Sequence, residues 1–233
     1  ACSQELAKRI AQLSAPKVHF TATEYGVFVE AEGISAHGST PAQGENAIGR
    51  LILALDTLPF EGDIGEVIHF LASTLGMESD GKSAGIYLHD DVSGDTSLNW
   101  GTLDGDECSL SMKINYRYPV TKCYADCAPT LDAAFTAAGF VKDMEQHKAK
   151  LYIPEDSILV KTLLNVYAEH TGQEGKAKCI GGGTYAKMLP NILAFGPIFP
   201  GDEVREHKPD EFIEISKLMK NAQIIASAMY EMA

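Results

Sequence analysis

Residues 97–118, SLNWGTLDGDECSLSMKINYRY, decide the architecture of the first half of the chain. From residue 108 to residue 118, apolar side chains alternate with polar ones, which is the period of a strand with one buried face. The turn Asp104-Gly105-Asp106 allows this strand, residues 107–118, to pair with an antiparallel strand at residues 97–103. The hairpin therefore predicts a sheet whose apolar face needs a cover of helices.

The preceding residues supply a second strand pair and two helices. Period-two alternation predicts strands around a turn within residues 16–33. Thr40, Pro41 and Gln43 then form the pattern of an N-cap, a first-turn proline and a capping box, which predicts a helix that starts at Pro41. A further apolar stripe at helical spacing predicts a second helix around residues 67–75.

A helix near residues 122–138 and a strand at residues 149–153 complete this pattern. The order strand, strand, helix, helix, strand, strand, helix, strand predicts an α+β domain over residues 1–153, an antiparallel sheet with helices on one face.

Residues 154–233 have a different order of predicted elements, in which helices and strands alternate as in an α/β fold. The expected elements are helices at residues 156–170 and from residue 210 onward, and strands at residues 176–180 and 192–195. So few elements bury too little surface for an independent domain. We therefore expect an incomplete α/β segment that lacks partner strands.

Composition excludes several classes of function. The 233 residues carry 19 Lys and Arg against 32 Asp and Glu, which gives a net charge of −13. Nucleic acids and anionic membrane surfaces are therefore not expected as partners. The longest apolar stretch, residues 51–55, is too short to span a bilayer. Five cysteines form neither a disulfide framework nor paired CxxC elements, so we expect reduced thiols and a cytoplasmic protein.

Two single residues could carry chemistry in the first half. His37 precedes an expected helix and could donate a hydrogen bond to a developing oxyanion, or it could be an ordinary surface or capping histidine. Arg117 lies on the polar face of its strand, where its planar donors suit a substrate carboxylate; a solvated arginine is the alternative.

The second half offers a glycine-rich turn and a loop histidine. Gly181, Gly182, Gly183 and Thr184 could bring backbone N–H groups close to an anion, or could form a plain tight turn. His207 lies in an acidic loop. HExxH, HxH and HxD pairs are missing, and His89-Asp90-Asp91 is typical of an exposed acidic loop, so the sequence does not contain a complete metal site.

Taken together, three segments resemble the C-terminal end of the dinuclear zinc dipeptidases of the PepV type, in the aminoacylase–carnosinase superfamily. These segments are CIGGGTYAKMLPN (179–191), AFGPIFP (194–200) and HKPDE (207–211). In addition, GISAHGSTPAQGENAI (33–48) resembles the start of the family's lid domain, and INYRYP (114–119) resembles its arginine-bearing strand. The motifs occur in family order.

The resemblance implies a cytoplasmic zinc peptidase that cleaves dipeptides or short peptides with a metal-activated water. Residues 1–153 would form the lid, resembling a dimerisation domain, and residues 154–233 the end of the catalytic domain. His37 would stabilise the oxyanion, Arg117 and the Gly182-Gly183-Thr184 backbone would hold the substrate carboxylate, and His207 would bind zinc.

The complete enzyme would hold two zinc ions. We expect this chain alone to bind zinc weakly or not at all and to be inactive, because the family's N-terminal catalytic half, with most of its ligands, has no counterpart here. We expect that half either to have been removed or to be supplied by another chain; the first residue, Ala1, decides little between these by itself. The alternatives are a deacylase of N-acyl amino acids in the same superfamily and a noncatalytic binding or oligomerisation module.

Overall fold

The computed structural model describes residues 8, 10–106, 108–203, 205 and 210–233. The chain divides into two compact units, Ala1–Gln146 and His147–Ala233. Helices and small antiparallel sheets make up the chain, so its fold is α+β. Within the described ranges, no helix is both long and apolar enough to cross a membrane.

The expected hairpin forms the centre of the first unit. Strand β5 (Ser97–Gly105) pairs antiparallel with β6 (Leu110–Arg117). The register shifts between Trp100 and Thr102, because a β-bulge lies at this point of β5. This shift lets Leu103 join Trp100 in packing toward the core.

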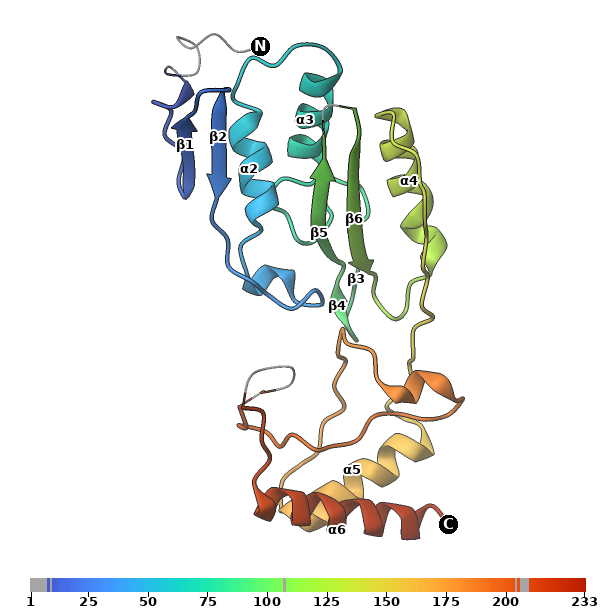
Figure 1. The fold of residues 1–233 in the computed structure, drawn as a ribbon. Helices are drawn as coiled ribbons and strands as arrows, with labels where there is room; N and C mark the ends of the chain where they lie inside the picture. Colours follow the sequence, from blue (N-terminus) through green and yellow to red (C-terminus); the bar gives the residue numbers. More distant parts are fainter. Residues whose placement is uncertain (1–7, 9, 107, 204, 206–209) are drawn as a thin grey trace. The chain divides into compact units, whose positions relative to one another are not determined.

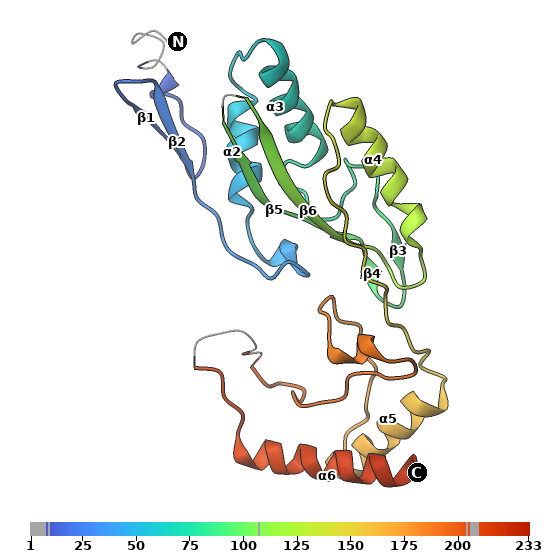
Figure 2. The same ribbon diagram turned by 45° about the vertical axis from the view of Figure 1, so that its right-hand side comes forward.

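Three helices cover the apolar face of this hairpin (Figures 1 and 2). They are α2 (Ala47–Leu55), α3 (Gly62–Thr74) and α4 (Ala128–Ala137). Leu71 of α3 and Trp100 of β5 are almost completely buried where helices and strands meet. Their shared core also contains Ile52, Ile68, Leu75, Ile86, Leu98 and Leu131.

Two smaller strand pairs accompany the central hairpin. Strand β1 (Val18–Ala22) pairs with β2 (Val27–Ala31), and β3 (His89–Asp90) pairs with β4 (Gly94–Asp95). The described chain thus has three two-stranded sheets rather than the single sheet that the sequence predicts. Helix α2 packs against both β1–β2 and β5, which joins the hairpins through side chains instead of backbone hydrogen bonds.

Two boundaries in the first unit differ from prediction. Pro41–Gln43 forms only a 3-10 turn, η1, and the helix proper starts at Ala47, because Asn46 caps it. The predicted helix at residues 122–138 is divided into a 3-10 turn, η2 (Tyr124–Asp126), and α4.

The second unit is built on two helices. Leu163 and Val166 of α5 (Ile158–Thr171) pack against Ile224 and Ala228 of α6 (Ile215–Glu231). A 3-10 turn, η3 (Tyr185–Met188), lies between them in sequence.

The strands predicted at residues 149–153, 176–180 and 192–195 are wrong for the described chain, which forms no strand there. A strand needs a neighbour with which to exchange backbone hydrogen bonds, and the described part of this unit provides none.

Candidate functional site

The loop that carries His37 is closed at its base by backbone hydrogen bonds. The N–H of Ile34 donates to the carbonyl of Glu45 at 3.0 Å, and the N–H of Glu45 donates back to Ile34 at 2.9 Å. A Cβ atom on Gly33 would lie 2.6 Å from the Glu45 carbonyl oxygen, so this closure requires a glycine. Residues 34–45 therefore form a ring with fixed ends.

The side chain of Glu45 fixes the base of the loop to two other elements. It accepts a hydrogen bond from Lys17 Nζ at 2.6 Å, and it also pairs with Arg50 of α2. The hydrogen bonds from Lys17 and Arg50 lower the pKa of the Glu45 carboxyl group. The charged carboxylate of Glu45, paired with Lys17 and Arg50, therefore anchors the base of the loop.

His37 is exposed within this ring, and one of its ring nitrogens is engaged. His37 Nδ1 lies 2.6 Å from Ser39 Oγ and 3.2 Å from the backbone nitrogen of Ser39. Nε2 has no hydrogen-bond partner among the described residues. The free nitrogen is thus available to an outside group.

Arg117 reaches the same loop from the end of β6. Its Nη1 donates a hydrogen bond to the carbonyl oxygen of Gly38, the residue that follows His37. Burial lowers the pKa of this half-buried guanidinium, which stays charged at neutral pH. No carboxylate in the described part of the chain forms an ion pair with Arg117. The structure therefore brings Arg117 and the His37 loop into contact, and the roles of Arg117 and His37 stay predictions.

Asn99 is a polar residue of this region that the sequence pattern did not single out. It pairs across the hairpin with Asn115, and its Nδ2 lies 3.8 Å from the position of a Cβ atom on Gly38. The register of the hairpin is the signal that would have found it. Asn99 alternates with buried Leu98 and Trp100 on β5, and Arg117 pairs with Ser97 on the same side of the hairpin, so both belong to the polar face.

The glycine-rich turn lies in the second unit. At both Gly182 and Gly183, the space that a side chain would occupy is open. Thr184 caps η3, since its Oγ1 accepts a hydrogen bond from the N–H of Ala186 at 3.3 Å. Gly183 and Thr184 are exposed, so backbone and hydroxyl groups are accessible to a ligand. Their role in binding a carboxylate stays a prediction.

His207, the predicted metal ligand, lies outside the described residues. Within the described ranges, no three His, Cys, Asp or Glu side chains gather so that they could hold a metal ion. These residues therefore do not fit a zinc centre by themselves.

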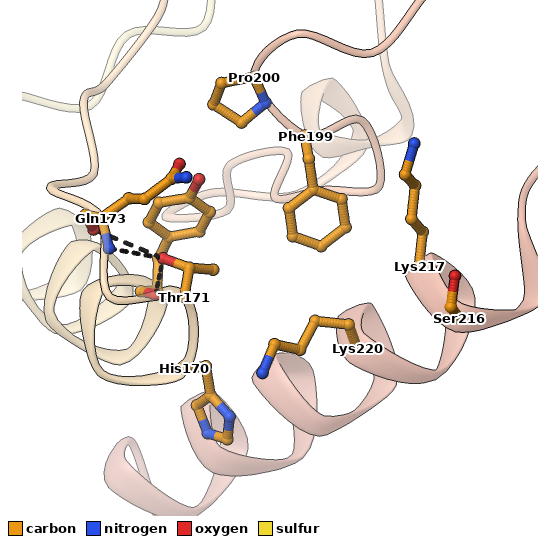
Figure 3. Close-up of a pocket in the computed structure, with 9 residues that line it drawn as sticks. His170, Thr171, Gln173, Phe199, Pro200, Ser216, Lys217 and Lys220 are labelled. Atoms are coloured by element: carbon orange, nitrogen blue, oxygen red, sulfur yellow. Dashed lines mark hydrogen bonds between the residues drawn. The ribbon is translucent and has the colours of Figure 1, made fainter.

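A separate cavity of about 400 Å³ lies between α5 and α6 of the second unit. His170, Thr171 and Gln173 line one side, and Lys217 and Lys220 line the other (Figure 3). The ring of Phe199 stacks on Tyr167 with centroids 6.5 Å apart. Lys217 is neutralised by Asp202 at 2.7 Å and Glu214 at 2.9 Å. No pattern in the sequence indicates this cavity.

Comparison with curated proteins finds relatives that are named as dipeptidases. Over 205 residues the chain is 35% identical to "Putative dipeptidase YtjP" of Bacillus subtilis, a match that covers 86% of this chain and 43% of that protein. It is 32% identical over 209 residues to the Beta-Ala-Xaa dipeptidase of Lactobacillus delbrueckii subsp. lactis, again covering 86% and 43%. No protein-family model matches the chain.

The chain spans about 43% of the length of these curated relatives. The similarity supports peptide hydrolysis as the general function of the group to which the chain is related.

Proposed function

We propose, from this relationship to dipeptidases, that the chain is part of an enzyme that hydrolyses dipeptides. Its matches cover less than half of each relative, which supports a contribution to the enzyme rather than the whole of it. Residues 1–153 would be the lid that holds the substrate, and residues 154–233 would belong to the catalytic domain.

The observation that carries this proposal is the environment of Arg117. A half-buried guanidinium without a carboxylate partner among the described residues is a site prepared for an anion, because its desolvation is offset when a carboxylate binds. The C-terminal carboxylate of a dipeptide has this chemistry. One Arg117 nitrogen already donates to Gly38, so the remaining donors of the fork would bind the substrate.

His37 would act at the scissile peptide bond. When water adds to the carbonyl carbon, the carbonyl oxygen gains negative charge, and an N–H donor placed beside it lowers the barrier. The C–N bond then breaks, and the leaving amine takes up a proton that the attacking water has given up. The free Nε2 of His37, on a loop that Arg117 also contacts, supports this role.

Zinc is the cofactor expected from the family resemblance, with two ions in the complete enzyme, and when bound it would supply an activated water. The described residues do not assemble a metal centre by themselves. We propose that His207 contributes one ligand and that a further protein segment provides the others.

The test compares two ligands on the 233-residue chain: the dipeptide Ala-Ala and its C-terminal amide. NMR titration should show shifts at Arg117 and Gly38 with Ala-Ala and weaker shifts with the amide. Arg117→Lys keeps the charge but loses the planar fork, so we expect affinity to fall by about 10- to 100-fold. In the full-length enzyme, KM should rise by a similar factor.

Lys113→Gln provides the matched control, because Lys113 is an exposed cation on the same strand. Equal binding of the acid and the amide, or an unchanged affinity in Arg117→Lys, would remove Arg117 from the site. Such a result would favour a noncatalytic binding or oligomerisation module.

A further inference from the structure

The short segment His37-Gly38-Ser39 folds back on itself so that Ser39 contacts the ring of His37 twice. The backbone nitrogen of Ser39 lies 3.2 Å from His37 Nδ1, and the Ser39 hydroxyl oxygen lies 2.6 Å from the same nitrogen. Ser39 is half-buried, whereas the imidazole is exposed.

The first of these contacts indicates which ring nitrogen carries the proton, and the second, shorter contact holds the proton there. A backbone N–H can only donate, so Nδ1 must accept and cannot hold a proton in the neutral ring. With Nδ1 as the acceptor, the Ser39 hydroxyl is the donor of the shorter contact, and the two donors share the single lone pair of Nδ1. The single proton of the neutral ring is left on Nε2, the nitrogen without a partner among the described residues.

We infer that Ser39 is a positioning residue that holds His37 in the Nε2–H tautomer and turns this donor outward. The catalytic consequence of this inference rests on the proposed function. An oxyanion needs a donor rather than a lone pair, and the other tautomer would present a lone pair at Nε2.

The backbone around Ser39 is held as firmly as the ring. The carbonyl of His37 accepts a hydrogen bond from the N–H of Thr40 at 2.8 Å, and the carbonyl of Gly38 accepts one from Arg117. The bridge between Ile34 and Glu45 closes the base of the loop. The orientation of Ser39 toward Nδ1 is therefore built into the loop, and the Nε2–H group is positioned before any substrate binds.

The test reads the tautomer directly, by ¹⁵N NMR of the histidine rings in the 233-residue chain at a pH where the ring is neutral. In the wild type, Nδ1 should resonate as an unprotonated nitrogen and Nε2 as a protonated one. Ser39→Ala keeps the longer backbone contact but loses the shorter hydroxyl donor, so the Nε2–H tautomer is held less firmly and both signals should move toward each other. Ser39→Thr should restore them.

Ser35→Ala is the matched control, because Ser35 is an exposed serine of the same loop. It should leave the ring signals unchanged. A protonated Nδ1 in the wild type, or identical ring signals in wild type and Ser39→Ala, would overturn the inference.

In the full-length enzyme, Ser39→Ala should lower kcat by about threefold to tenfold with little change in KM, and Ser39→Thr should recover it. An unchanged kcat would overturn the catalytic consequence of the tautomer. The NMR readout does not depend on turnover. A failure of the dipeptidase proposal therefore leaves the tautomer result standing and is distinguishable from a failure of the inference.

Discussion

Asp90 is a nearly buried carboxylate that ties the β3–β4 hairpin to the segment after β6. Its oxygens accept hydrogen bonds from the backbone and hydroxyl of Thr121 at 2.9 Å and 2.8 Å, and also from Ser93. Burial alone would raise the pKa of Asp90, but these hydrogen bonds outweigh it and hold the pKa well below its usual range. The sequence interpretation of residues 89–91 as an exposed loop is wrong for Asp90.

Replacing this carboxylate should cost stability in a pH-dependent way. Because its pKa is depressed in the folded state, Asp90 stabilises fully above the unfolded value of about 4 and loses its contribution as pH falls further. Asp90→Asn should lower the unfolding free energy by about 1–3 kcal/mol at pH 7, and the difference from wild type should shrink in acid.

Urea unfolding followed by fluorescence measures this effect, since the single tryptophan, Trp100, is buried in the same unit. Asp91→Asn serves as the control, because the neighbouring Asp91 side chain is fully exposed. A pH-independent loss would show that Asp90 does not act through its charge.

His37 allows a second prediction at the level of one residue. If its Nε2–H stabilises the oxyanion, His37→Ala in the full-length enzyme should lower kcat by about 10²- to 10³-fold, with a smaller change in KM. Steady-state kinetics on a dipeptide would measure this. His19→Ala is a suitable control, because His19 is exposed and pairs only with Glu32 among the contacts described. Full activity in His37→Ala would make His37 an ordinary surface histidine.

Among the elements, α2 shows which of two competing start signals the chain uses. Thr40, Pro41 and Gln43 have the sequence pattern of a helix start, yet Thr40 makes no side-chain cap hydrogen bond. Asn46 caps α2 instead: its Oδ1 accepts from the N–H of Ile48 at 2.9 Å, and its Nδ2 donates to the Trp100 carbonyl at 3.0 Å. The tertiary contact with β5 favours the later cap.

The two start signals can be separated by mutation. Asn46→Ala removes a cap and a contact between helix and strand, so we expect the first unit to lose about 1–3 kcal/mol of unfolding free energy. Gln43→Ala, at the residue that the sequence pattern places in a capping box, should change it by less than about 0.5 kcal/mol. Urea unfolding monitored at Trp100 measures both variants. A larger loss of unfolding free energy in Gln43→Ala than in Asn46→Ala would favour a helix start at Pro41.

The strand β6 could be predicted from sequence, because its side chains alternate between a buried and a wet face. The pair β3–β4 could not, since its strands have two residues each and carry no period. In the candidate site, His37 and Arg117 could be predicted because the chemistry of their side chains suits an oxyanion and a carboxylate. Ser39 and Asn99 were missed because their importance depends on which atoms they contact, and this follows from the loop path and the hairpin register.

Across the whole molecule, the two units differ in how much apolar surface they bury. The core of the first unit contains Trp100, Leu71 and many neighbours, whereas the second has a small cluster around Val166 and Ile224. Helix α6 also leaves Leu218, Met219 and Met229 exposed. The second unit therefore buries less apolar surface, and we expect it to open locally more easily than the first.

Hydrogen exchange on the 233-residue chain should show this difference. We expect the amide of Val166 in α5 to exchange about tenfold faster or more than that of Leu71 in α3, although both side chains are buried. Mass spectrometry or NMR under native conditions measures both helices in one sample, so each serves as the reference for the other. Equal protection would mean that the small cluster suffices to stabilise its unit.

The closure of the His37 loop bears on how such a protein can diversify. Its ring is fastened by main-chain atoms of Ile34 and Glu45, which any residue possesses, and the crowded positions Gly33 and Gly44 are the ones that demand glycine. Substitutions at the exposed positions Ser35 and Ala36 therefore leave the fastening intact. Evolution can therefore change the exposed side chains of this loop, and with them the choice of ligand, while the loop stays closed.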